Sequence, residues 1–252
     1  MGRTGSPATR HVAAVERAIA VLDVLADGEL GTNEVGRRTG LNASTASRQL
    51  ATLAAAGLVA HIEETGRYRL GPRLVELGNA ALAGLDVREL ARPHLRALAA
   101  STGETSTLSV PGDPDAITID FVQSPSSVQS VARVGRPSIA HATATGKIAL
   151  AFGEVELPPG QLRAYTTRTV VDRELLAREI ETARERGYAE ALGEREDDLN
   201  AIAAPVLGAT GELVAVIGLQ GPASRFGAVT VRASRATLLE HAAAVSGALG
   251  RS

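Results

Sequence analysis

Apolar residues in the first part of the chain recur at the spacing of amphipathic helices. A first helix is predicted over residues 12–26, where this spacing is carried by Val12, Val15, Ile19, Leu22 and Leu25. A second is predicted over residues 32–39 with Thr32 as its N-cap, and a third runs from its N-cap Asn42 to about residue 56. Two consecutive short helices joined at Thr39-Gly40 indicate a helix-turn-helix.

Two short strands follow the third helix. They are predicted at residues 58–62 and 67–70, on either side of a Glu64-Thr65-Gly66 turn. A further helix is predicted over residues 72–85, with Leu74, Leu77 and Leu82 at helical spacing. This order predicts a winged helix-turn-helix, a shape that places one helix in a DNA groove.

The second part of the chain mixes strand and helix patterns. We predict, in chain order, helix 86–101, strands 105–110, 116–123 and 128–134, helices 145–152 and 172–187, strands 200–206 and 213–219, and helix 230–249. This order is typical of an α+β domain with an antiparallel sheet. We therefore expect a disordered arm at residues 1–11, a winged helix-turn-helix domain at 12–71, a linker helix at 72–85 and a second domain at 86–252.

Composition narrows the class of protein. The formal net charge is −2, so any DNA contact has to come from a local basic patch. The chain has no cysteine, which excludes disulfides, thiol catalysis and cysteine zinc sites. We find neither the apolar run of roughly 18 residues that a membrane span needs nor a signal-peptide core, so we expect a cytoplasmic protein with no membrane contact.

The third helix carries the polar face expected to contact DNA. Ala46, Leu50 and Leu53 fall at i, i+4 and i+7 and form its buried stripe. The other side presents Ser44, Thr45, Ser47, Arg48 and Gln49. The Arg48 side chain can reach a guanine edge and the Gln49 side chain an adenine edge, whereas hydroxyls more often hold phosphates.

The wing is expected to add phosphate contacts. Arg67 and Arg69 alternate along its second strand, so both should project from one face. Thr32 and Asn42, at the starts of two helices, complete the expected DNA-binding set. No carboxylate lies between Asn42 and residue 56, which favours a polyanionic partner. The alternatives are a polar face that is merely solvated and a winged helix that binds protein.

Several long segments resemble one known family. They are VERAIAVLDVLADG, TGLNASTASRQLATLAAAGLV, GRYRLGPRLVELG, HATATGKIALAF and RERGYAEALGEREDDLNAIAAPVLGATGELVAVIGLQGPASRF. Together, in this order, they resemble the IclR family of bacterial transcription regulators over residues 12–249.

The resemblance implies a function for each domain. Residues 86–252 would form a GAF-like domain for effector binding and oligomerisation. A homodimer or homotetramer would bind a palindromic double-stranded DNA operator, with repression more usual than activation. Effectors in this family are typically small carboxylates, including aromatic acids, so a small organic acid is the expected partner besides DNA.

The helix predicted to open near Thr143 suits an anionic effector. Its first residues are small, and free backbone N–H groups together with the helix dipole attract anions. The resemblance places the effector pocket at Ala144, Thr145, Ala191, Ala201, Gly218 and Gln220, and Gly146 at the same helix start completes the expected set. Family members carry Asp, Cys and Ser at three positions that are Ala191, Ala201 and Gly218 here. This departure predicts an effector larger or more apolar than glyoxylate, or a degenerate pocket without a ligand.

Signs of catalysis are few. The segment around Lys147 is not a Walker A loop, because His141 takes the first glycine position, and a surface or second-shell lysine is expected. His141 is expected to be a structural hydrogen-bonding residue, and Glu194–Asp198 a solvated acidic loop rather than a metal site. No serine elbow or metal-spaced histidine pair occurs. We therefore expect a regulator with no metal, cofactor or enzymatic activity; the alternatives are a small-molecule enzyme built on the second domain and an interaction scaffold.

Overall fold

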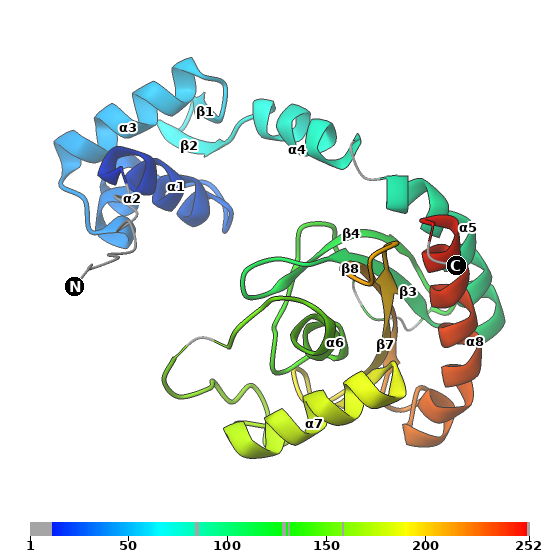
Figure 1. Ribbon diagram of the computed structural model, residues 1–252. Helices are drawn as coiled ribbons and strands as arrows, with labels where there is room; N and C mark the ends of the chain where they lie inside the picture. Colours follow the sequence, from blue (N-terminus) through cyan, green and yellow to red (C-terminus); the bar gives the residue numbers. More distant parts are fainter. Residues whose placement is uncertain (1–11, 84–85, 128–129, 131, 158, 251–252) are drawn as a thin grey trace, which may run out of the picture. The chain divides into compact units, whose positions relative to one another are not determined.

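A computed structural model describes residues 12–83, 86–127, 130, 132–157 and 159–250. The arm expected at residues 1–11 lies outside these described residues. The chain divides into two compact units, Met1–Gly84 and Leu85–Ser252, and each has a buried apolar cluster (Figure 1). None of the described helices combines the length and the hydropathy needed to cross a membrane.

The described part of the first unit contains four helices and a hairpin. Its elements are α1 (Ala13–Leu25), α2 (Thr32–Thr39), α3 (Ala43–Ala55), β1 (Val59–Ile62), β2 (Arg67–Leu70) and α4 (Arg73–Ala83). β1 and β2 pair antiparallel, and Leu30 forms an additional bridge with Tyr68 of β2. The predicted order of a winged helix-turn-helix is confirmed.

The core of the first unit uses only part of the apolar stripe that predicts α1. Val21 and Leu25 are buried where α1 packs on α2, α3 and β2. Val12, Val15 and Ile19 are 64, 56 and 52% exposed. Apolar residues cover two adjacent faces of this helix, and only packing against other elements decides which face is buried.

Helix α2 does not begin as predicted. Gly31, not Thr32, is its N-cap, and no side chain caps this end. Leu30 exchanges two backbone hydrogen bonds with Tyr68, of 3.0 and 2.9 Å, which keep the chain extended up to Gly31. Thr32 is therefore the first helical residue, and its hydroxyl cannot serve as the cap.

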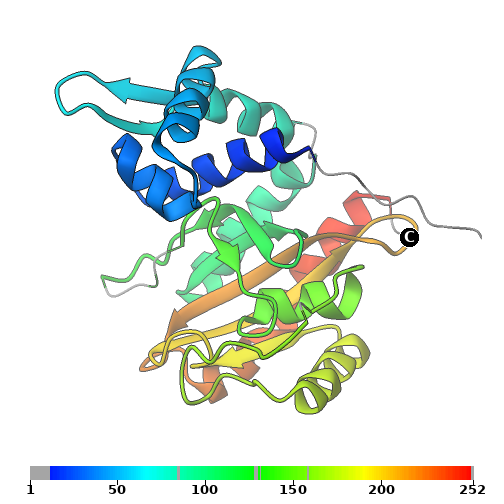
Figure 2. The ribbon, with the colours of Figure 1, turned by 90° about the vertical axis from the view of Figure 1, so that its left-hand side faces the viewer.

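The second unit is an antiparallel sheet with helices on both faces (Figures 1 and 2). Its elements are α5 (Asp86–Thr102), β3 (Thr105–Val110), β4 (Ala116–Val122), β5 (Pro137–Ser138), α6 (Ala144–Phe152), α7 (Arg173–Arg186), β6 (Ala189–Leu192), β7 (Leu199–Leu207), β8 (Leu213–Pro222) and α8 (Ala228–Ala248). The strand order is β5-β4-β3-β8-β7-β6. α5 and α8 cover one face, and α6, with α7 packed on it, covers the other. The predicted α+β class is confirmed.

Three parts of this sheet differ from the prediction, one of them the two-residue strand β5, which was not predicted. The strand predicted at 128–134 is wrong, because Ser130 and residues 132–134, its described part, lie outside any strand. Ser130 instead forms hydrogen bonds with Gln123 and Gln220, so side-chain contacts hold this loop beside the sheet. Strand β6 was not predicted because its sequence, AEAL, consists largely of weak strand formers.

Candidate DNA interface and effector pocket

The start and the rotation of helix α3 are both set by local contacts. Asn42 Oδ1 accepts a hydrogen bond from the Thr45 backbone N–H at 2.8 Å, so the predicted N-cap is confirmed. Ala46, Leu50 and Leu53 are buried, as the i, i+4, i+7 pattern predicts. These contacts determine which side chains of α3 face solvent.

The outer face of α3 presents the side chains expected at DNA. Ser44, Ser47 and Arg48 are exposed, and Thr45 and Gln49 are half-buried. Within the described part of the chain, the Arg48 guanidinium forms no hydrogen bond or ion pair. It can therefore turn toward a base edge without breaking an existing contact.

The two wing arginines are not equivalent. Arg69 is exposed, whereas Arg67 turns back toward α2. Arg67 Nη2 donates to the Glu29 carbonyl oxygen at 2.6 Å and lies 3.0 Å from Glu34 Oε2. Arg67 is thus already engaged within the first unit, because a carboxylate distant in sequence lies within reach of its long side chain.

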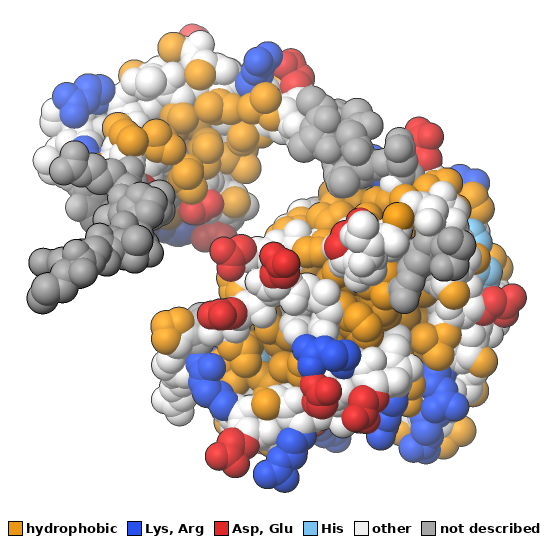
Figure 3. Space-filling view, in the orientation of Figure 1, with side chains coloured by type: hydrophobic (Ala, Val, Ile, Leu, Met, Phe, Trp, Pro, Cys, Tyr) orange, Lys and Arg blue, Asp and Glu red, His pale blue; other side chains and the backbone are white. Residues whose placement is uncertain are grey.

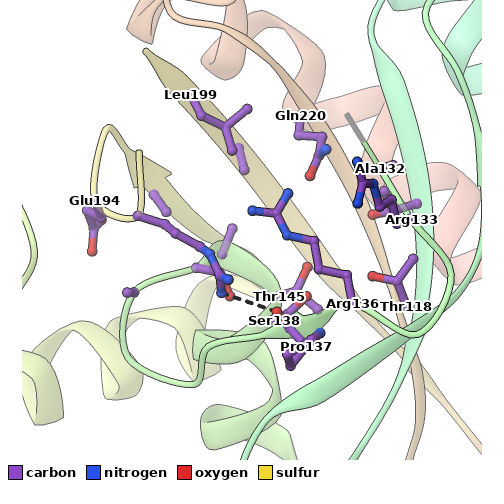
Figure 4. A pocket seen from close by; sticks show the side chains of 17 residues that line it. Thr118, Ala132, Arg133, Arg136, Pro137, Ser138, Thr145, Glu194, Leu199 and Gln220 are labelled. Carbon is purple, nitrogen blue, oxygen red and sulfur yellow. Dashed lines mark hydrogen bonds between the residues drawn. The ribbon is translucent and has the colours of Figure 1, made fainter. Parts of the chain in front are cut away.

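A cavity of about 60 Å³ lies in the second unit, beside the N-terminus of α6 (Figure 4). This volume is several times the roughly 10–15 Å³ that one water molecule needs, so a small organic molecule is a plausible occupant. Five residues expected in the effector pocket line it: Ala144, Thr145, Ala191, Ala201 and Gln220.

Two expected pocket residues, Gly146 and Gly218, do not line the cavity. A Cβ atom at Gly146 would lie 2.3 Å from the Ile139 carbonyl oxygen, and one at Gly218 would lie 2.8 Å from Thr107 Oγ1. Gly146 therefore needs glycine, because the atoms close to it belong to the backbone. At Gly218 the close atom is a side-chain hydroxyl, so a larger residue would require Thr107 to move.

The first turn of α6 leaves two backbone donors beside the cavity. Thr143 Oγ1 accepts a hydrogen bond from the Gly146 N–H at 2.9 Å, so Gly146 has no free donor to offer. In the described structure, the N–H groups of Ala144 and Thr145 have no hydrogen-bond partner. Unpaired N–H groups at a helix N-terminus, where the dipole is positive, form a suitable site for an anion.

Comparison with known proteins matches both units. The family model for the IclR helix-turn-helix domain matches residues 14–62, and that for the bacterial transcriptional regulator IclR C-terminal domain matches residues 79–247. This chain belongs to the IclR family. It is a DNA-binding transcriptional regulator.

Individual IclR relatives match over nearly the whole chain. The HTH-type transcriptional regulator XynR of Escherichia coli (strain K12) is 31% identical over 246 residues, which cover 95% of this chain and 98% of XynR. An IclR transcriptional regulator from Alicyclobacillus acidocaldarius has a TM-score of 0.80 at 29% identity, covering 95% of this chain and 100% of that one. An IclR homolog from Microbacterium hydrocarbonoxydans, complexed with 4-hydroxybenzoate, has a TM-score of 0.76 at 26% identity, covering 94% and 99%.

A buried ion pair lies at the wall of the pocket of this IclR-family regulator. Lys147 Nζ lies 2.7 Å from Glu194 Oε1 and 2.8 Å from Glu179 Oε2, and Lys147 is only 3% exposed. Lys147 is thus an interior residue, not a surface one. The expectation of a solvated loop is wrong for Glu194, which is buried beside Lys147. Burial raises the pKa of the Glu194 carboxyl, and the nearby Lys147 ammonium group opposes this rise.

His141 has the structural role expected for it in this IclR-family chain. Its Nε2 lies 2.9 Å from the Arg163 carbonyl oxygen, and its ring is buried. Across the described residues, no group of three His, Asp or Glu side chains is arranged to hold a metal ion.

The sequence analysis missed the cationic lining of the pocket. Arg133, Arg136 and Arg195 all contribute to it. Arg136 forms an ion pair with Glu196 at 2.5 Å, and Arg195 Nη1 donates to the Pro137 carbonyl oxygen at 3.2 Å. Burial, followed by the nearby Arg136 charge, lowers the pKa of Arg195. The only available signal was that these arginines lie close in sequence to positions already assigned to the pocket.

Proposed function

We propose that this regulator is a repressor whose affinity for a palindromic operator is controlled by a small organic acid bound in the second unit. The observation that carries the proposal is the electropositive cavity at the N-terminus of α6, in the same chain as a winged helix-turn-helix. A ligand-free, degenerate pocket is disfavoured because the unpaired N–H groups of Ala144 and Thr145 would then have no anion to bind.

At the operator, α3 supplies the contacts that distinguish sequences. Arg48 and Gln49 are assigned to base edges. Phosphate contacts are assigned to Thr32, Asn42, Ser44, Thr45, Ser47 and Arg69, which lie on the helix starts, the outer face of α3 and the wing. Arg67 fixes the wing against α2 through its contacts with Glu29 and Glu34. We assign it no direct DNA contact, and it affects DNA binding only through the position of Arg69.

In the effector pocket, the carboxylate binds to the N–H groups of Ala144 and Thr145. Ala191, Leu199 and Ala201 line the cavity and suit the carbon skeleton of the ligand. Support comes from the Microbacterium relative, whose bound 4-hydroxybenzoate is itself a small carboxylate.

We further propose that the regulator acts as a dimer or a tetramer. Apolar side chains gather over α1 in Figure 3, where Val15 and Ile19 are 56 and 52% exposed. On α4, Val75 and Leu77 are 64 and 48% exposed. Such surfaces are typical of an interface between chains, and a two-fold dimer would match the two halves of a palindromic operator.

The experiment is operator binding by the full-length protein with and without a panel of organic acids. We expect protection of two half-sites about a helical turn, or a multiple of one, apart, and a change in affinity with at least one acid. A reporter gene behind the operator should be expressed more strongly when the regulator gene is deleted. Protection of a single unrepeated half-site by a monomer would refute the dimer, and lower reporter expression on deletion would refute repression.

A further inference from the structure

The cavity carries more positive charge than one carboxylate requires. Three arginines line it, Arg133, Arg136 and Arg195, whereas Glu194 is the only acidic residue among its described lining. A single carboxylate on the effector would already be satisfied by the backbone N–H groups at the start of α6. The arginines therefore add positive charge to the cavity beyond what a single carboxylate at the α6 N-terminus would use.

Glu194 does not balance the arginines. Its carboxylate lies 2.7 Å from Lys147 Nζ, which also pairs with Glu179 at 2.8 Å. In Figure 4, Glu194 lies at the edge of the pocket, apart from Arg136 and Gln220. Glu194 therefore lines the cavity but is held on the Lys147 side, and among the described residues it forms no ion pair with any of the three arginines.

Arg136 and Arg195 repel each other across one wall of the cavity. Burial and the charge of Arg136 lower the pKa of Arg195, against the opposing effects of Tyr165, Glu196 and Asp115. An anion placed between the two guanidinium groups would relieve this repulsion and replace lost hydration with hydrogen bonds.

The ion pair between Arg136 and Glu196 does not prevent such binding. Its ion pair with Glu196 is partly exposed, with side chains 36 and 45% accessible, and pairs of this kind contribute little to stability. In Figure 4, the Arg136 side chain extends into the pocket that Gln220 and Thr145 also line. A guanidinium has five N–H donors, so it can bind a ligand and Glu196 together.

We infer that the effector is a dianion, with one carboxylate at the α6 N-terminus and a second anionic group, carboxylate or phosphate, at Arg136 and Arg195. A cavity of about 60 Å³ requires a short spacer between the two groups. This inference rests on the proposed function and names the chemical class of its effector.

The test is calorimetric titration of the full-length protein with matched ligands. Each short aliphatic dicarboxylate is compared with its monomethyl ester, which has the same skeleton and one charge fewer, and with an analogue bearing a phosphate for one carboxylate. We expect the dianions to bind roughly 10- to 100-fold more tightly than the esters, as expected for hydrogen bonds to a charged group. Whichever dianion binds more tightly, the dicarboxylate or its phosphate analogue, identifies whether the second anionic group of the effector is a carboxylate or a phosphate.

Three variants assign this preference to the cavity. Arg195→Gln and, independently, Arg136→Gln should remove most of the preference while leaving affinity for the esters nearly unchanged. Arg232→Gln is the matched control, because Arg232 is exposed on α8 and does not line the cavity. Operator affinity without ligand checks that each variant is folded.

The outcomes separate this inference from the proposed function. If the esters bind as tightly as the diacids, or if the preference survives in both arginine variants, the dianion is refuted while an acid-controlled regulator stands. If operator DNA is bound but none of the acids or esters binds, the effector pocket and the dianion are refuted together.

Discussion

Lys147 and Glu194 form an ion pair of 2.7 Å at the wall of the cavity, and both side chains are buried. Lys147 belongs to α6, whose first turn carries the proposed anion site, and Glu194 immediately precedes Arg195 in the loop after β6. The other carboxylate oxygen, Glu194 Oε2, is buried without a hydrogen-bond partner among the described residues. The pair thus links two walls of the pocket, but it leaves one carboxylate oxygen of Glu194 buried without a hydrogen bond from any described residue.

Replacing Lys147 by methionine should destabilise the second unit by about 3–5 kcal/mol, the usual cost of leaving one partner of a buried pair uncompensated. The pKa of Glu194 is already raised by burial and should rise further without Lys147. A carboxyl group whose pKa is higher in the folded than in the unfolded protein destabilises the folded state. This destabilisation grows as the pH rises from the pKa of the unfolded state to that of the folded state.

Urea unfolding at about pH 5 and about pH 8 measures this effect, and the loss should be greater at the higher pH. The double variant Lys147→Met/Glu194→Gln is the control, since it has no carboxyl at this position to titrate. An equal loss for Lys147→Met at both pH values would show that the Glu194 charge is not the cause.

Arg69→Ala should flatten the plot of log operator affinity against log salt by about 0.9 units, the contribution of one phosphate contact. Arg67→Ala is the natural comparison. It removes the contacts with Glu29 and Glu34 and should lower the free energy of unfolding by roughly 1 kcal/mol with little change in slope. Salt titrations of both variants test these assignments. A flatter slope for Arg67→Ala alone would show that Arg67, and not Arg69, contacts a phosphate.

Arg48→Ala should lose about 1–3 kcal/mol of discrimination between the operator and a scrambled duplex, because a bidentate contact to guanine would disappear. Binding of the variant to the two duplexes at one salt concentration is the measurement. Equal weakening on both duplexes would identify Arg48 as a phosphate contact.

Ala201→Phe should abolish the response to effector while leaving operator affinity intact. Ala201 lies on β7, opposite Gln220 of β8, and lines the cavity, so a phenyl ring there would occupy the ligand's space. Ala209→Phe places the same ring at an exposed turn residue as control. Operator binding across an effector titration is the readout, and an unchanged effector response in Ala201→Phe would remove β7 from the site.

Local signals predicted most of the elements, because caps and apolar spacing act within a few residues. Asn42 and Asp172 cap α3 and α7, and Gly187, with φ of 75°, ends α7. The face of α1 that enters the core could not be chosen in the same way, since Val12, Val15 and Ile19 fit helical spacing but remain exposed.

The charges of the pocket depend on contacts between residues far apart in sequence. Lys147 and Glu194 are 47 positions apart, and Arg136 and Glu196 are 60 apart. Nothing in the spacing of either residue indicates its partner, so the cationic wall and the buried pair emerged only from the fold. Small residues at Ala144, Ala191 and Ala201 were predictable as pocket positions from the family resemblance, and all three line the cavity.

The most direct measurement is the linkage between effector and operator in the full-length protein. An operator selected from random duplexes is titrated with and without the tightest-binding acid, and that acid is titrated with and without the operator. Thermodynamic linkage requires both affinities to change by the same factor, and we predict a factor of roughly 5 to 150. An acid that binds in the cavity but leaves operator affinity unchanged would contradict control of DNA binding by this pocket.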